Sequence, residues 1–219
     1  MSDNGQYQSA ARNNGRIWNS SNYGTTWTAR SVTKDWMSIA MSATGQYQSA
    51  VSTNNNLVIG SIWTSINYGV TWSEKTATRN YNWEGIAMSA TGQYQSAYTE
   101  NQKNNGSIWT SINYGVTWVE QTATRNYVWD GIVISSDGSK QSALGSNLIW
   151  TSNNYGATWT QQTDTGGKLW ESIAMSADGS VQTAVIRGGS IWTSDNYGTT
   201  WVEKTATAGK EWNSIAMSK

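Results

Sequence analysis

The sequence predicts an all-β fold made of five copies of one four-stranded unit, and three observations support this prediction. The eight residues SINYGVTW occur at 65–72 and again at 111–118, and near-copies occur at 20–27, 152–159 and 194–201. All 15 tryptophans fall into five sets of three. The first members of successive sets lie 41 to 46 residues apart, at Trp18, Trp63, Trp109, Trp150 and Trp192. A period of about 40–50 residues is typical of the four-stranded blades of a β-propeller.

Each unit contains four short strand-like segments separated by turn residues, which we call strands A to D. In the last complete unit they are WESIAMS at 170–176, VQTAVI at 181–186, GSIWTS at 189–194 and TWVEKT at 200–205. Turns such as SATG and SADG end in glycine, which suits tight reversals. Isoleucine and tryptophan are adjacent on strand C, and adjacent residues of a strand point to opposite faces. Both faces must therefore be covered, as they are when sheets pack between sheets.

The two ends of the sequence predict how the ring closes. The chain opens in strand B at 5–10 and ends after strand A at 211–218, so the last segment supplies the strand that the first unit lacks. We expect this C-terminal strand to complete the N-terminal blade and to remove its exposed edge. The prediction is one five-bladed propeller domain over 1–219, with four antiparallel strands per blade. Its blades span roughly 1–30 plus 211–219, 31–76, 77–122, 123–163 and 164–210.

Composition excludes several classes of function. The formal net charge is zero, with 14 basic and 14 acidic residues, which argues against nucleic acid and against an anionic membrane surface. No apolar run approaches the roughly 20 residues of a membrane span. Histidine and cysteine are absent, which removes Ser-His-Asp chemistry and thiolate metal sites. We expect a soluble monomer with no metal and no cofactor. The polar N-terminus shows no signal peptide, and the compartment stays open.

The repeated octapeptide resembles the Asp-box of sialidase-type (BNR) propellers, S-x-D-x-G-x-T-W. In the copy at 65–72 the matching residues are Ser65, Gly69, Thr71 and Trp72. The resemblance implies a structural turn between strands C and D, on the side opposite the ligand. Asparagine replaces the box aspartate in every copy, at Asn22, Asn67, Asn113, Asn154 and Asn196. Because asparagine also hydrogen-bonds the local backbone, we expect the turn to survive the substitution.

Loop lengths indicate which face of the propeller is variable. The spacing across the A–B and C–D turns is constant, whereas the B–C and D–A loops differ between copies. Those two loop types share one face, and variable loops on a fixed scaffold often carry binding sites. The longest B–C loops are at 52–60 and 98–106. Each D–A loop carries a cation, with an acid next to the strand A tryptophan, and the simplest interpretation is a set of exposed ion pairs.

The D–A loops of the second and third units contain the candidate ligand-binding residues. The segments TRNYNWEG and TRNYVWDG combine a cation, two aromatic rings and a carboxylate, which suits stacking and hydrogen bonding to sugars. The tryptophans of these segments could instead be packed between blades. The candidate residues are Arg79, Tyr81, Trp83, Glu84, Arg125, Tyr127, Trp129 and Asp130.

Two interpretations of function remain open. The first is a non-catalytic, lectin-like binding module for glycans or another surface polymer, on the face of the B–C and D–A loops. The second is a structural or designed repeat scaffold with no small ligand. A glycoside hydrolase using Glu84, Asp130 and Glu171 is less favoured, because Met37 and Asn213 hold the same position in other units. The sialidase family's proline-containing arginine segment is missing too, so we expect no enzymatic activity and no catalytic residue.

Overall fold

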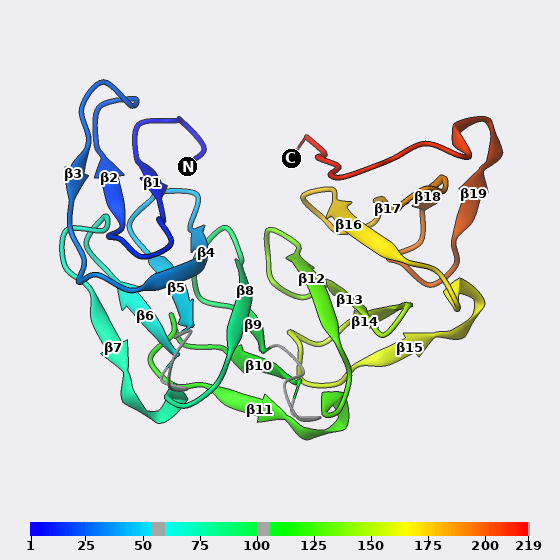
Figure 1. Ribbon diagram of the computed structural model, residues 1–219, viewed down its shortest axis with the longest axis horizontal. Coiled ribbons are helices and arrows are strands. Elements are labelled where there is room, and N and C mark those ends of the chain that lie inside the picture. The colour runs from blue at the N-terminus through cyan, green and yellow to red at the C-terminus, as the bar shows by residue number, and fades with distance from the viewer. Residues whose placement is uncertain (54–59, 100–105, 219) are drawn as a thin grey trace.

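The computed structural model describes residues 1–53, 60–99 and 106–218, and five antiparallel sheets follow one another around an open arc (Figure 1). Sheet 1 has three strands, β1 (Gln8–Ala10), β2 (Trp18–Ser20) and β3 (Thr28–Ala29). Sheet 2 contains β4 (Asp35–Met41), β5 (Gln48–Thr53), β6 (Ser61–Ser65) and β7 (Ser73–Lys75). Sheet 3 contains β8 (Trp83–Met88), β9 (Gln95–Thr99), β10 (Ile108–Ser111) and β11 (Val119–Gln121).

The remaining two sheets repeat the same order. Sheet 4 contains β12 (Trp129–Ile134), β13 (Gln141–Gly145), β14 (Leu148–Ser152) and β15 (Thr160–Gln162). Sheet 5 contains β16 (Trp170–Met175), β17 (Gln182–Ile186), β18 (Ile191–Ser194) and β19 (Val202–Lys204). In sheets 2 to 5 strand A lies at the inside of the arc and strand D at the outside (Figure 1). The predicted all-β fold of five repeated sheets is confirmed.

Apolar side chains fill the spaces between neighbouring sheets. One cluster joins Val51 and Ile62 of sheet 2 to Trp83, Ile86 and Trp109 of sheet 3. A similar cluster joins sheet 3 to sheet 4, and another joins sheet 4 to sheet 5. Large apolar residues on both faces of a sheet are thus buried only when a second sheet lies on each side. The expectation that both faces of strand C would be covered is confirmed.

A polar layer crosses the same interfaces at the start of strand B. Ser49 Oγ of sheet 2 donates to Gln95 Oε1 of sheet 3 at 2.7 Å, and Gln95 Nε2 donates to the Gly92 carbonyl at 2.9 Å. Both side chains are fully buried. Equivalent serine–glutamine bonds join each pair of successive sheets, as Ser9–Gln48, Ser96–Gln141 and Ser142–Gln182. Buried amides are tolerated here because their hydrogen bonds are met by the next sheet.

The Asp-box segments form the turns between strands C and D. In the copy at 65–72, Asn67 Oδ1 accepts from Ser65 Oγ at 3.0 Å and from the Thr71 amide at 2.9 Å, while Asn67 Nδ2 donates to Thr71 Oγ1 at 2.9 Å. The left-handed backbone falls on the next two residues, Tyr68 and Gly69, with φ of 60° and 77°. The same bonds recur in the other four copies.

The D–A loops contain short 3-10 helices: η1 (Thr76–Thr78), η2 (Thr122–Thr124), η3 (Thr163–Thr165) and η4 (Thr205–Thr207). Thr78 anchors the first of them, because its Oγ1 accepts from the Ile62 amide at 2.9 Å and donates to the Lys75 carbonyl at 2.7 Å. Threonine plays the same part in the other three loops. These loops therefore leave the outer strand at a fixed angle.

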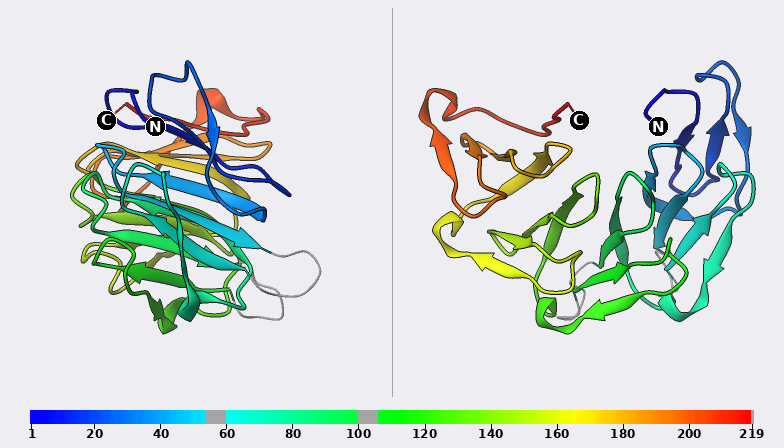
Figure 2. Two further views of the ribbon diagram at one scale, coloured as in Figure 1. Left: turned by 90° about the vertical axis from the view of Figure 1, so that its left-hand side faces the viewer. Right: turned by 180° about the vertical axis from the view of Figure 1, so that it is seen from behind.

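Closure by the C-terminal strand is not confirmed. The termini lie on opposite sides of an opening between sheet 5 and sheet 1, and Figure 2 shows the same opening from behind. Residues 211–218 form no strand, and the Ile215 amide donates to Ser172 Oγ of β16 at 3.3 Å instead of pairing with β1. Sheet 1 consequently has three strands, and its predicted fourth strand stays a prediction.

The polar layer generates a test of the inter-sheet interface. Replacing Gln95 with alanine leaves the buried Ser49 hydroxyl and the Gly92 carbonyl without a partner, so we expect unfolding to become easier by about 1–3 kcal/mol. Urea denaturation followed by fluorescence measures the change. Gln93→Ala, a half-exposed glutamine in the same turn, is the control and should change stability by less than about 0.5 kcal/mol. Equal effects would contradict the structural role of Gln95.

Candidate functional site

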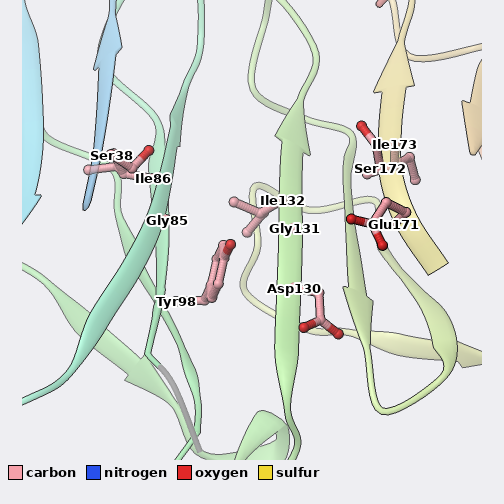
Figure 3. Close-up of a pocket in the computed structure, with 10 residues that line it drawn as sticks. All are labelled: Ser38, Gly85, Ile86, Tyr98, Asp130, Gly131, Ile132, Glu171, Ser172 and Ile173. Carbon is pink, nitrogen blue, oxygen red and sulfur yellow. The ribbon is translucent and has the colours of Figure 1, made fainter. Parts of the chain in front are cut away.

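A polar pocket opens at the centre of the arc, between the innermost strands of sheets 2 to 5 (Figure 3). Its volume is about 220 Å³. Ser38, Tyr98, Asp130, Glu171 and Ser172 provide the polar groups of its wall. The acidic residues lie at the start of their strands, where the D–A loops enter the sheets. The pocket therefore lies on the face that the loop lengths single out.

β-Bulges place the acidic side chains in this position. The pairing of strands A and B shifts by one residue between Trp129 and Gly131, and likewise between Trp83 and Gly85. Asp130 and Glu84 are the extra residues at these shifts. A bulged residue is left out of the ladder, and its side chain is aimed differently from those of its neighbours. In Figure 3 the carboxylate of Asp130 projects from the lower part of β12.

Tyr98 belongs to the same pocket and was not found by sequence reasoning. It lies at the end of β9 opposite Gly85, where sheets 2, 4 and 5 have Val51, Leu144 and Val185. A Cβ atom at Gly85 would lie 2.2 Å from the Tyr98 ring, so the ring occupies space that only glycine leaves free. The departure of one copy from the repeat is the signal that could have revealed it.

The electrostatics of the pocket are negative. Burial raises the pKa of Tyr98, and the charges of Glu84 and Asp130 raise it further, so the hydroxyl stays protonated and can donate. Desolvation in the pocket, followed by the nearby Glu171, raises the pKa of Asp130, although its side chain remains accessible. Arg187 pairs with Glu171 at 2.9 Å and partly offsets its charge. The pocket thus offers one hydroxyl donor beside carboxylate acceptors.

The two candidate arginines lie away from this pocket. Arg79 pairs with Glu74 of β7, and Arg125 pairs with Glu120 of β11, both at the outer strands. These hydrogen bonds lower the pKa values of Glu74 and Glu120. Pairing with the acid next to the tryptophan, expected from sequence, is wrong for both arginines. The 3-10 helix brings each arginine back to strand D, whereas the bulged acid faces the centre.

The candidate tryptophans and tyrosines form two aromatic trios. Trp83 and Trp129 are buried, with exposures of 0% and 3%, and pack between sheets. Tyr81 meets Trp109 edge-on with ring centroids 4.9 Å apart, and Tyr127 meets Trp150 in the same way at 4.7 Å. Both tyrosines are half-buried. The structure therefore brings Glu84 and Asp130 to the pocket but places the candidate aromatic residues in the inter-sheet packing.

Part of the predicted site falls outside the described residues. The long B–C loops expected to contribute to binding correspond mostly to 54–59 and 100–105. Within the described ranges, no group of three or more acidic, histidine or cysteine side chains is placed to hold a metal ion. Over the same ranges, no helix is both long enough and apolar enough to cross a membrane.

Comparison with known proteins identifies the repeat. Residues 191–205 match the BNR-Asp box repeat. The chain carries an Asp-box repeat. This match confirms the resemblance drawn from the octapeptide, and it covers the C–D turn of sheet 5. No curated protein matches the chain by sequence.

Solved structures with a similar fold differ widely in function. A GH74 xyloglucanase from Xanthomonas campestris is 14% identical with a TM-score of 0.66, over 90% of this chain and 36% of the other. A nidogen/laminin complex is 16% identical with a TM-score of 0.63, over 94% and 80%. TolB from Acinetobacter baumannii is 14% identical with a TM-score of 0.62, over 94% and 52%. The chain spans about a third of the GH74 enzyme. Likeness at such low identity shows the fold alone.

The contact between Tyr98 and Gly85 can be tested by a double-mutant cycle. Gly85→Ala alone forces the ring out of its place, so we expect a loss of about 1–3 kcal/mol in the free energy of unfolding. Adding Tyr98→Val recreates the small residue of sheets 2 and 5 and should recover at least about 1 kcal/mol of that loss. Chemical denaturation of the four proteins measures the coupling. Strict additivity would show that the two residues do not contact each other.

The environment of Asp130 predicts a pH-dependent stability difference. Because its pKa is raised above the unfolded value of 3.8, the folded state binds the proton more tightly, and stability is lost as pH rises from that value through the folded pKa. Asp130→Asn cannot ionise, so its advantage over the wild type should grow from near zero at pH 3 to a plateau, below about 1 kcal/mol, at pH 7. Denaturation at several pH values measures this difference. A constant difference across the range would contradict the interpretation.

Proposed function

We propose that this chain is a non-catalytic binding module whose central pocket takes a small carbohydrate unit. The observation that supports this most directly is the bulged Asp130 beside Tyr98 and Glu171, in a pocket on the variable face. Sugar hydroxyls both donate and accept hydrogen bonds, and they match a protonated phenol next to carboxylates. The pocket is smaller than the roughly 300–1,000 Å³ of drug-sized sites, which favours a single sugar unit.

Charge narrows the chemical class of the ligand. The pocket wall contains two carboxylates, whereas Arg79 and Arg125 are held by Glu74 and Glu120 on the outer strands. A carboxylate-bearing sugar would meet repulsion here with no free arginine to offset it. A neutral sugar avoids that cost, and the ammonium group of an amino sugar gains from it. The ligand class we propose is therefore neutral or amino sugars.

Hydrolysis is the second candidate, because one specific observation favours it. Asp130 faces Glu171 across the pocket, and the pKa of Asp130 is raised, as a general acid requires. The position of these two acids in the repeat nonetheless holds Met37 in sheet 2, so the pair was not built by repetition. A scaffold with no small ligand is the remaining alternative.

One experiment separates these possibilities. The protein is screened on a glycan array containing neutral, amino and sialylated glycans, and binders are titrated by calorimetry. We expect binding of neutral or amino sugars, at least a tenfold loss in Asp130→Asn, and no binding of sialylated glycans. Asp195→Asn is the matched control, because it makes the same charge change on the opposite side and copies the Asn153 of sheet 4.

Each alternative has its own outcome in this experiment. Release of a shorter sugar during the titration, lost in Asp130→Asn and retained in Asp195→Asn, would show hydrolysis and contradict the non-catalytic proposal. Absence of binding across the whole array would favour the scaffold. Preferential binding of sialylated glycans would contradict the argument from charge.

A further inference from the structure

Successive sheets are joined by a backbone ladder at the turns between strands A and B. The Asp3 amide donates to the Ala43 carbonyl, Ala43 to Ala90, Ala90 to Ser136, and Ser136 to Ala177, at 2.6–2.9 Å. Each of the five turns belongs to a different sheet, and each amide donates to the same position of the next turn. The next step of the series would run from the Ala177 amide of sheet 5 to the Asp3 carbonyl of sheet 1.

The polar layer and the tyrosine contacts stop at the same place. Thr183 of sheet 5 holds the serine position that donates to the next glutamine, and the next glutamine around a ring is Gln8 of sheet 1. Tyrosines stack across three interfaces, as Tyr7–Tyr68, Tyr47–Tyr114 and Tyr94–Tyr155, at 4.3–4.5 Å. Lys140 takes this position over Tyr197 at the fourth interface. The fifth pair would be Val181 and Tyr23, and both are exposed.

The inner edge of sheet 1 is also uncovered. Ala10 of β1 is exposed, whereas the equivalent alanines of the other four sheets, Ala50, Ala97, Ala143 and Ala184, are 0% exposed. Trp18 of β2 is 40% exposed. In sheets 2 to 5 a strand A tryptophan meets the strand C tryptophan edge-on at 5.5–5.9 Å. Sheet 1 thus has the surface that a strand A would cover.

Residues 212–217 have the sequence of that strand. SIAM at 214–217 repeats the SIAM of β4 and β16, and Trp212 precedes it at the usual spacing. In the register of β4 with β5, Ile39 faces Ala50 and Met41 faces Gln48. Transferred to sheet 1, this register sets Ile215 opposite Ala10 and Met217 opposite Gln8.

We propose that residues 212–217 add to β1 as its fourth strand and draw sheet 5 onto sheet 1 of the same chain. The open arc, with the Ile215 amide on Ser172, and the closed ring are two positions of this one segment. Closure forms the fifth copy of each inter-sheet contact: the Ala177 amide on the Asp3 carbonyl, the Thr183 hydroxyl on Gln8, and Val181 on Tyr23. It also places Asn213 at the bulge position that Asp130 holds in sheet 4. This proposal does not depend on any ligand.

Disulfide trapping tests the register, because the chain contains no cysteine. Facing residues of an antiparallel pair have Cα atoms about 4.5–5.5 Å apart, which suits a disulfide. The double variant Ala10→Cys/Ile215→Cys traps the closed ring, and Ser172→Cys/Ile215→Cys traps the open arc. Both are oxidised at low protein concentration and analysed by non-reducing electrophoresis and peptide mapping.

We expect an intramolecular 10–215 disulfide in most molecules, formed at least tenfold faster than the 172–215 disulfide. A 10–215 disulfide that links two molecules would show strand exchange between copies and overturn closure within one chain. Formation of the 172–215 disulfide alone would overturn the proposal in favour of the open arc. Circular dichroism of both reduced variants confirms that they fold, so failure to fold is not mistaken for failure to close.

Discussion

The packing of sheet against sheet is the constraint on which the rest of this structure depends. Strand C of a typical copy carries large apolar side chains on both faces, such as Ile62 and Trp63, so an isolated sheet would expose one of them. Burial on both sides is achieved only by repetition around an axis. The buried serine–glutamine bonds, exemplified by Ser49 and Gln95, then fix the offset between neighbours, because a slipped sheet would leave those groups unsatisfied.

Repetition and function are separated in this chain. Residues that recur in every copy, such as the box asparagine Asn67 and the glutamine Gln95, serve turns and interfaces. The pocket instead depends on departures from the repeat: Tyr98 where other copies have aliphatic residues, Gly85 beneath it, and Asp130 where sheet 2 has Met37. A side chain that occurs once is free of the packing role shared by its counterparts, and its chemistry can be assigned to one site.

The sequence predicted the parts of the structure that recur and missed those that depend on a single residue or on long-range geometry. Tryptophan spacing located the sheets, and the octapeptide located the C–D turns. The bulge that aims Asp130 leaves the residue count of strand A unchanged, so no spacing signals it. The partner of Arg79 was misassigned because a 3-10 helix, invisible to periodicity, turns the chain back to Glu74. Closure depends on small angles summed over several interfaces, which local patterns do not encode.

The chemistry of the pocket shows why the family resemblance carries the fold further than the function. A propeller that recognises an acidic sugar needs unpaired cations at its centre, and this chain holds Arg79 and Arg125 in ion pairs at the rim. Freeing either arginine would leave the partly buried Glu74 or Glu120 without its hydrogen-bond partner, which opposes a simple rearrangement toward the axis. Carboxylates remain as the ionisable groups of the pocket wall together with the protonated Tyr98. The same scaffold is therefore directed to ligands of neutral or positive charge.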